Sequence, residues 1–558
     1  MAAMTLFEED KAFVLEAFMR GEFDFMESAG EVVETDFFRF IQARGLLEGL
    51  ARTYPNPRRK NDVPVSLYVV SELAMRLHGV HSFHGLALIV RSGGMLNAFG
   101  GKFGRKVLHP DRKEVTVLCE GTNRKNHYPR QTPCDPDYVR KLAKDTDAAR
   151  LMRWFNTDAV KLLRAKRAFD KEGLCIGDAS YLFVPDNDAY EGSVRMLFDE
   201  HNHPVGKDDV ETMTPSQRER CRWRRCYKLV SLLHVNRKRD YFLVLAAAVI
   251  SGKDHECPVL YALVDQLVET LGKGVIRRLI LDRGFLDGKA IARCKRELEI
   301  DVLIPLRRNM DLYKDAMALF ALDTTAWREY APPAPPPPLP MRPPPKAVRE
   351  RERTRQATLA ERRRQTPPPA PDTVRVKSEV AVIANFKSWD SCSVPLSVVA
   401  SRDTFADHAQ ETWLLLDTAC VADPAGPRND YALRAAIEER HRQWKCFCNL
   451  TGFTSRAFSL VVNQVVFVLL TYNLLQLFLL REDRKELAGI PPPLARQHLL
   501  PAAEHVILYY QNRYGLFAPF ELIGVTARLP EDPRVKIART CDRLRSEFYH
   551  QLQHPRPP

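Results

Sequence analysis

Three acidic residues have the sequence surroundings expected of catalytic carboxylates. Asp178 ends the short apolar run LCIGD, and Asp282 ends a second run, VIRRLILD. Catalytic groups of α/β sheets gather at such strand ends, although a single acid there is often only a turn or cap residue. Glu438 lies in a helical segment, YALRAAIEERHRQWK. Together, the three residues predict an acidic site built by two strands and one helix.

The third acid belongs to a set of regularly spaced side chains. Tyr431, Arg434, Glu438 and Lys445 follow the pattern Y-x2-R-x3-E-x6-K. On an α-helix these offsets are close to whole turns, so the side chains are expected along one broad face. An ordinary charged and solvated helix is the simpler interpretation. It does not explain why an aromatic ring, two bases and an acid share one stripe.

Such a set suits the chemistry of phosphodiester cleavage. This reaction needs a deprotonated nucleophile and stabilised charge on the attacking and leaving oxygens, which two divalent ions about 3.5–4 Å apart provide. Mg²⁺ and Mn²⁺ take oxygen ligands, so Asp178, Asp282 and Glu438 are predicted to bind two such ions jointly. Arg434 and Lys445 are predicted to hold DNA phosphates, the first by a planar fork and the second as a point charge.

From about Ser66 to Lys445, with a core that begins near Leu174, the chain resembles the insertion-sequence DDE transposases that carry the YREK signature. The signature spacing is complete, and the DRGF motif at Asp282 is similar to the second-aspartate motif of many members. A β-rich insertion before the Glu is a further family feature. The resemblance implies a ribonuclease-H-like fold in which the three acids bind metal. It also implies that the signature tyrosine, arginine and lysine grip the DNA backbone near the transposon end.

Some relatives use a tryptophan to receive a base that is flipped out of the duplex. Trp413 opens a WLLL strand shortly before the signature and is the candidate for this role. The alternative is that Trp413 is a strand residue buried against the sheet. The other nearby tryptophans are Trp389, in a polar stretch, and Trp444, which is expected to pack in the core.

The sequence departs from the family pattern in two places. The first motif, GDAS, is short and generic, so Asp186 and Asp188 compete with Asp178 for the first position. Both follow Pro185 in an expected loop, which argues against them. The stretch at about 331–374 is rich in proline and arginine and poor in large apolar residues. It is expected to be disordered, because it cannot bury enough apolar surface to fold.

The order of the elements predicts an α/β fold, a mixed sheet covered by helices. Three apolar runs after Leu174 predict neighbouring strands, and a helix, a strand, a helix and a strand follow. We therefore expect a helical DNA-end-binding or dimerisation region at 1–165, the first part of the core at 166–308, an insertion with β-strands at 309–417, the core helix with the catalytic Glu at 418–455, and a helical C-terminal region at 456–558.

The composition fits a DNA-binding protein of the cell interior. The 558 residues carry a formal net charge of +13, which favours a polyanionic partner. The 12 cysteines lack the C-x2-C spacing of a zinc site and are expected to be reduced, and the N-terminus has no apolar signal core. The stretch Phe458–Leu480 is long enough to cross a membrane. Asn463, Gln464, Asn473 and Gln476 interrupt it, which favours a buried core helix.

These features predict a transposase that binds terminal inverted repeats, cleaves DNA and joins the freed 3′ ends to a target. The resemblance further implies a homodimer that pairs two ends of double-stranded DNA. The expected location is the cytoplasm of a prokaryote, at the nucleoid and not at a membrane. Two other interpretations stay open: a domesticated DNA-binding protein that kept the fold, and a nuclease without strand transfer. The presence of all three acids argues against the first of these.

Overall fold

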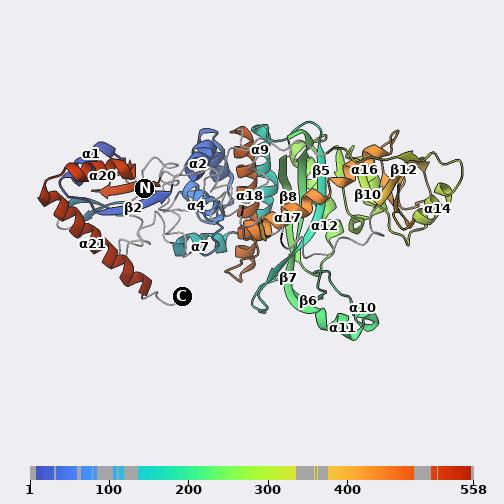
Figure 1. Ribbon diagram of the computed structural model, residues 1–558, viewed down its shortest axis with the longest axis horizontal. Helices are drawn as coiled ribbons and strands as arrows, with labels where there is room; N and C mark the ends of the chain where they lie inside the picture. Colours follow the sequence, from blue (N-terminus) through green and yellow to red (C-terminus); the bar gives the residue numbers. More distant parts are fainter. Residues whose placement is uncertain are drawn as a thin grey trace.

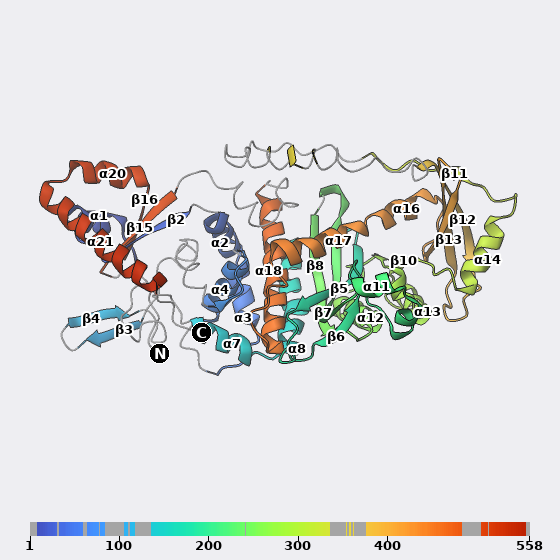
Figure 2. The same ribbon diagram turned by 60° about the horizontal axis from the view of Figure 1, so that its bottom comes forward.

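The computed structural model describes residues 8–30, 33–59, 64–77, 79–83, 105–109, 112–117, 136–239, 241–334, 353, 357–358, 361, 375–482, 504–511 and 513–553. The molecule is elongated, and its parts follow one another along the long axis (Figure 1). A unit built from both chain ends lies at one extremity, a layer of helices follows, and a large mixed sheet fills the other half (Figures 1 and 2). The predicted mixed α/β class is confirmed.

Five strands form the centre of the sheet: β5 (Leu174–Val184), β7 (Arg222–Asn236), β8 (Tyr241–Ser251), β9 (Arg278–Ile280) and β10 (Asp301–Pro305). Their spatial order is β8-β7-β5-β9-β10. The pairs β8–β7 and β7–β5 are antiparallel, whereas β5–β9 and β9–β10 are parallel. β7 is the central strand of the antiparallel part, and it is buried without interruption from Arg225 to Val235.

Helices cover both faces of these strands. On one face lie α12 (Glu256–Leu271) and α13 (Gly288–Arg296), and on the other lies α18 (Phe458–Arg481). Successive side chains of a strand point to opposite faces, and β7 shows this directly. Val230 and Leu232 belong to the core that contains α12, whereas Leu229 and Leu233 belong to the core that contains α18.

Helix α18 is the segment that composition alone could have assigned to a membrane. Among the described residues it is the one helix long and apolar enough, and most of it is buried inside the protein. Its polar side chains are satisfied there. The Tyr68 hydroxyl donates to Asn463 Oδ1, Asn463 Nδ2 donates to Glu72 Oε1, both over 2.9 Å, and Gln464 Nε2 donates to the Leu450 carbonyl over 2.8 Å. Buried polar groups with such partners identify a core helix of a folded protein.

Two asparagines from different helices close the outer edge of β8. Asn473 of α18 accepts from the Val244 N–H and donates to the Val244 carbonyl, both over 2.8 Å. Asn156, in the π-helical turn η3 (Phe155–Ala159), makes the same two bonds with Ala247 over 2.9 Å. An open strand edge leaves backbone groups unpaired, and these side chains satisfy four of them.

The β-rich insertion extends the central sheet beyond β10. It comprises α14 (Asp311–Phe320), β11 (Arg328–Glu329), β12 (Arg375–Phe386), β13 (Leu396–Phe405) and β14 (Gln410–Asp417). β14 pairs antiparallel with β10, and the sheet continues through β13 and β12 to β11. Strands are therefore present in the insertion, as the sequence predicts. The disorder expected at 331–374 falls almost entirely outside the described residues.

A smaller extension leaves the sheet at the beginning of β7. It consists of β6 (Val194–Phe198), α10 (Lys207–Thr212) and α11 (Pro215–Arg220), and it projects from the body of the protein (Figure 1). β6 lies opposite residues 222–226 of β7, and β8 lies opposite residues 227–236. The two strands therefore occupy the same edge of β7, one after the other.

The helical layer comes from the N-terminal region. It contains α2 (Val33–Ala43), α3 (Leu46–Thr53), α4 (Val65–Leu77), α7 (Pro136–Asp145), α8 (Ala148–Trp154) and α9 (Val160–Ala165), with a separate hairpin of β3 (Arg105–His109) and β4 (Arg112–Val117). Helix α18 packs against α2, α4, α7 and α8. The layer is thereby joined to the sheet through α18.

Both ends of the chain build one terminal unit, which differs from the two separate helical regions expected at 1–165 and 456–558. Its sheet has the order β1-β16-β15-β2. The elements are β1 (Glu8–Glu9), α1 (Lys11–Met19), β2 (Phe25–Gly30), β15 (Glu504–Tyr510), β16 (Arg513–Phe517), α20 (Pro519–Arg528) and α21 (Glu531–Gln553). Val14, Phe18, Leu508 and Phe517 share its core. No local pattern reveals a pairing between segments so distant in sequence.

Candidate active site

The signature segment is not the single regular helix that its spacing suggested. It divides into α16 (Ala425–Ala432), α17 (Ala435–Arg442) and the π-helical turn η7 (Gln443–Phe447). At the junction of the first two helices, the N–H groups of Leu433, Arg434 and Ala436 bond to carbonyls three residues back, which tightens the turn. Arg434 therefore lies at a bend, and Lys445 lies in a widened turn.

The structure brings the three predicted acids together around one side chain. Arg434 Nη1 lies 2.7 Å from Glu438 Oε1. Its Nη2 lies 3.4 Å from Asp282 Oδ2 and 3.6 Å from Asp178 Oδ2. The guanidinium, with 20% of its side chain exposed, is thus shared by all three carboxylates. A site for a positive charge exists where β5, β9 and the signature segment meet.

The two aspartates are oriented in the same way by their own backbone. Asp178 Oδ1 accepts from the N–H of Ala179, and Asp282 Oδ1 accepts from the N–H of Arg283, each over 2.8 Å. These local bonds leave the second oxygen of each carboxylate facing Arg434. Asp282 also caps the short 3-10 turn η5 (Arg283–Phe285), which comes soon after the end of β9. The acids therefore have defined orientations rather than solvated, mobile ones.

Burial differs strongly among the three carboxylates. Asp178 is buried, Asp282 is half-buried, and Glu438 has a side chain that is 60% exposed. Burial raises the pKa of Asp178 to about 6; Arg434 and the Ala179 N–H oppose the rise, while Asp282 and Glu438 add to it. A carboxylate that is desolvated beside two other acids is held ionised mainly by a nearby positive charge.

The carboxylate oxygens of the three acids are suitable ligands for hard divalent ions, but the Arg434 guanidinium now lies between them. In the described part of the chain, no group of three His, Cys, Asp or Glu side chains is arranged to hold an ion. The same three carboxylates instead contact Arg434. Oxygen donors around a cationic position suit Mg²⁺ or Mn²⁺. Binding such an ion requires the Arg434 side chain to move from between the acids.

Lys445 and His441 complete the surroundings of Asp178. Lys445 Nζ donates to Ser180 Oγ over 2.6 Å, and burial lowers the pKa of this lysine to about 8. His441 is buried, with Nε2 3.1 Å from Ser231 Oγ and Nδ1 4.0 Å from Asp178 Oδ2. His441 is a residue of this site that the sequence motifs did not predict. The sequence feature that could have identified His441 is its position three residues after Glu438, which places both side chains on one side of a helix.

Trp413 lies between the insertion and the signature segment. Its ring is half-buried, 5.9 Å from the ring of Tyr431, and the guanidinium of Arg428 lies 5.4 Å from its centroid. Burial raises the pKa of Tyr431 to about 12, so its hydroxyl stays protonated near neutral pH. Trp444, in contrast, is fully buried, as expected. Trp413 therefore combines a partly exposed ring with a packing contact to the signature.

The competing acids are separated from this cluster. Asp186 pairs with Arg195 over 2.9 Å and with Arg225 over 3.6 Å, and Asp188 also pairs with Arg225. Both follow the end of β5, several residues beyond Asp178. Their contacts fix the loop after β5, and the structure does not bring them to Asp282 or Glu438.

The comparison with protein families gives an independent result. Residues 192–474 match the family described as the transposase DDE domain. The match covers just over half of the 558 residues, so the protein belongs to this family and is a transposase that acts on DNA. Asp282 and Glu438 lie inside the matched range, and Asp178 lies before it. A comparison with curated proteins finds no match.

Proposed function

We propose that this protein is an insertion-sequence transposase of the YREK type, which cleaves DNA at terminal inverted repeats and joins the freed 3′ ends to a target. The observation that carries the proposal is the convergence of Asp178, Asp282 and Glu438 on one guanidinium. Membership of the DDE family supports it, because enzymes of this family generally use divalent metal ions.

A ribonuclease-H-like core is part of the proposal. Its support is the strand order β8-β7-β5-β9-β10, with three antiparallel strands continued by two parallel ones. Asp178 lies within β5, and Asp282 lies just after β9, the adjacent parallel strand. The third comes from a helical segment that packs across the sheet. This arrangement joins residues that are far apart in sequence into one candidate site.

We assign Asp178, Asp282 and Glu438 as ligands of two Mg²⁺ or Mn²⁺ ions. When bound, such ions supply a deprotonated nucleophile and stabilise charge on the attacking and leaving oxygens. The contribution of the chain is to hold the three carboxylates ionised and oriented. The backbone bonds of Asp178 and Asp282 do this for two of them.

Tyr431, Arg434 and Lys445 are assigned to the DNA backbone. The planar guanidinium of Arg434 has a geometry that matches both carboxylate and phosphate groups. A DNA phosphate near the acids would therefore compete with them for Arg434. Lys445 is positioned beside Ser180, two residues from Asp178, and can hold a second phosphate as a point charge. Release of Arg434 to DNA would at the same time open the acidic site for metal.

Two further parts of the proposal concern the assembled complex. A homodimer would pair two ends of double-stranded DNA, with the N-terminal region contributing to end binding. Trp413 would receive a base that leaves the duplex near the cleavage point. Its partly exposed ring supports this role, since stacking of a base on an aromatic side chain is worth about 1–3 kcal/mol.

An excision and joining assay tests the proposal. A marker is placed between the DNA segments that flank the gene, and the protein is supplied separately in cells. We expect loss of the marker from the donor and its recovery in a target, both abolished by Asp282→Asn. Asp287→Asn is the matched control, because Asp287 only caps α13 and asparagine caps equally well. Excision without joining would indicate a nuclease, and joining by Asp282→Asn would contradict the proposal.

A further inference from the structure

One edge of β5 is left open directly beside the candidate active site. β7 pairs with β5 along its whole length, from Leu174 to Val184. On the opposite side, β9 pairs only with residues 174–176. Among the described strands, none continues that pairing, and the open edge contains Asp178. From Asp178 to Val184, this backbone edge of β5 is therefore not paired with another described strand.

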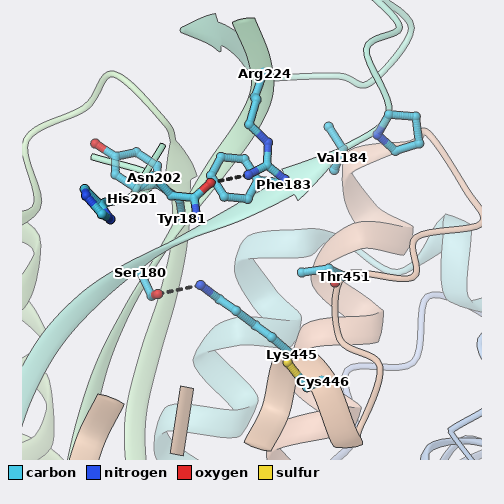
Figure 3. Close-up of a pocket in the computed structure, with 11 residues that line it drawn as sticks. Ser180, Tyr181, Phe183, Val184, His201, Asn202, Arg224, Lys445, Cys446 and Thr451 are labelled. Carbon is cyan, nitrogen blue, oxygen red and sulfur yellow. Dashed lines mark hydrogen bonds between the residues drawn. The ribbon is translucent and has the colours of Figure 1, made fainter. Parts of the chain in front are cut away.

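A cavity of about 670 Å³ lies along this edge. β5 contributes one side of it, the η7 turn a second, and the loop after β6 together with β7 a third (Figure 3). Ligand cavities of proteins have volumes of about 300–1,000 Å³, so the space suits a molecule of nucleotide size. The side chains that bear on its chemistry are Ser180, Tyr181, Phe183, Asn202, Arg224 and Lys445.

The walls of the cavity combine positive charge with flat surfaces. Lys445 reaches Ser180 from one side (Figure 3). On the other side, the guanidinium of Arg224 lies 3.4 Å from the centroid of the Phe183 ring, and it donates to Asn202 Oδ1. Of the described residues that line the cavity, none is acidic. A ligand with an anionic group and a planar, apolar group matches this combination.

We propose that this cavity holds one unpaired nucleotide of the DNA strand at the candidate active site, with its phosphate at Lys445 and its base against the Arg224–Phe183 pair. Unpaired bases stack on aromatic rings and on arginine planes, and they do so with little sequence preference. The site is separate from Trp413, which lies on β14 of the insertion. The inference rests on the proposed function and adds a second place where a base leaves the duplex.

The experiment compares two DNA probes of arbitrary sequence, a blunt duplex and the same duplex with a short single-stranded extension. Binding to the full-length protein is measured by fluorescence anisotropy in EDTA, where no cleavage occurs. Wild-type protein should prefer the extended probe. Arg224→Ala should weaken binding of the extended probe by about tenfold and change binding of the blunt probe less than about twofold.

A matched control separates stacking from charge. Arg222 lies two residues from Arg224 on β7, is exposed, and does not line the cavity. Arg222→Ala should weaken both probes alike and modestly, because only a phosphate attraction is removed. Phe183→Leu keeps apolar volume but removes the ring beneath Arg224, so it should also abolish the preference. Melting temperatures of the variants report their folding.

Three results would overturn the inference. The first is equal binding of both probes by wild-type protein, and the second is a loss in Arg224→Ala that matches Arg222→Ala on both probes. Either result leaves the proposed function intact. The third is failure of wild-type protein to bind either probe, which would overturn the inference together with the proposed function.

Discussion

Arg434 lies where the sequence alone would have placed a metal ion. The spacing of the signature predicts which side chains belong together, because helical offsets are fixed by geometry. The spacing did not predict that the guanidinium would bridge Asp178, Asp282 and Glu438. That orientation depends on the bend between α16 and α17, which arises from packing rather than from local pattern. The catalytic role of the three acids stays a prediction.

The bridging position gives a first prediction for stability. Arg434→Gln should lower the free energy of unfolding in EDTA by about 2–3 kcal/mol, since it leaves three neighbouring carboxylates without their counter-charge. Mg²⁺ should restore a large part of the loss, because the ion supplies the missing positive charge. Thermal melts with and without Mg²⁺ measure both effects. An equal loss in both conditions would show that Arg434 has only a packing role.

A second prediction follows from the buried carboxyl. The pKa of Asp178 is raised to about 6, so the folded protein binds this proton more tightly than the unfolded chain does. Without metal, stability should therefore fall as the pH rises from the ordinary carboxyl range through about 6. At a pH near 8 the folded protein bears the full free-energy cost of burying an ionised Asp178, and Asp178→Asn removes this cost. The variant should therefore be at least as stable as the wild type in EDTA at this pH and should gain no stability from Mg²⁺, as shown by melts at several pH values.

At the scale of elements, the sequence predicted those strands that depend only on a local run of apolar residues. The runs LCIGD and VIRRLILD both contain strands, because buried strands are written as short apolar runs. The expectation that each strand ends at its acid is wrong for Asp178, which lies inside β5, whereas Asp282 comes two residues after the end of β9. The π-helical turn at Lys445 and the extension of the sheet by β14 carry no such local signature. The roles of Asn156 and Asn473 at the edge of β8 could not be predicted either, since an edge strand and the side chains that cover it are brought together only by the fold.

Asn473 provides the test at this scale. Asn473→Leu should lower the free energy of unfolding by about 1–3 kcal/mol although leucine is more apolar, because the N–H and carbonyl of Val244 lose their partners. Thr471→Val is the matched control on the same helix, since the buried Thr471 hydroxyl has no hydrogen-bond partner among the described residues. This control should be neutral or stabilising in chemical denaturation. A neutral Asn473→Leu would show that the edge of β8 does not need covering.

For the whole molecule, the main surprise is the terminal unit. Charge and composition predicted a DNA-binding protein of several parts, and the sheet order places the core in one half of an elongated molecule. They could not predict that α1 shares a core with β15 and α21, or that β2 pairs with β15. Val14 and Phe18 from the start of the chain pack with Leu508 and Ile537 near its end. Such long-range pairing is set by tertiary packing, which no window of sequence contains.

This architecture predicts the outcome of two truncations. A protein shortened to residues 33–482 should fold, because the sheet, the helical layer and α18 remain together. A protein of residues 1–482 should aggregate, because α1 then exposes apolar side chains that share a core with β15 and β16, and β2 loses the strand with which it pairs. Size-exclusion chromatography and light scattering distinguish the two. Comparable solubility of both would argue against a shared terminal core.

The central claim is that Glu438 joins the two aspartates in a metal-dependent cleavage centre. Nicking of supercoiled plasmid by purified protein in Mg²⁺ tests it most directly, with Glu438→Gln compared with Glu439→Gln. Glu439 is the adjacent acid and pairs with Arg442 over 2.7 Å, away from the cluster. We predict that Glu438→Gln lowers the nicking rate by about a thousandfold, as loss of several kcal/mol of transition-state stabilisation implies, while Glu439→Gln stays near the wild-type rate. A Glu438→Gln protein that nicks DNA at the wild-type rate would contradict the account.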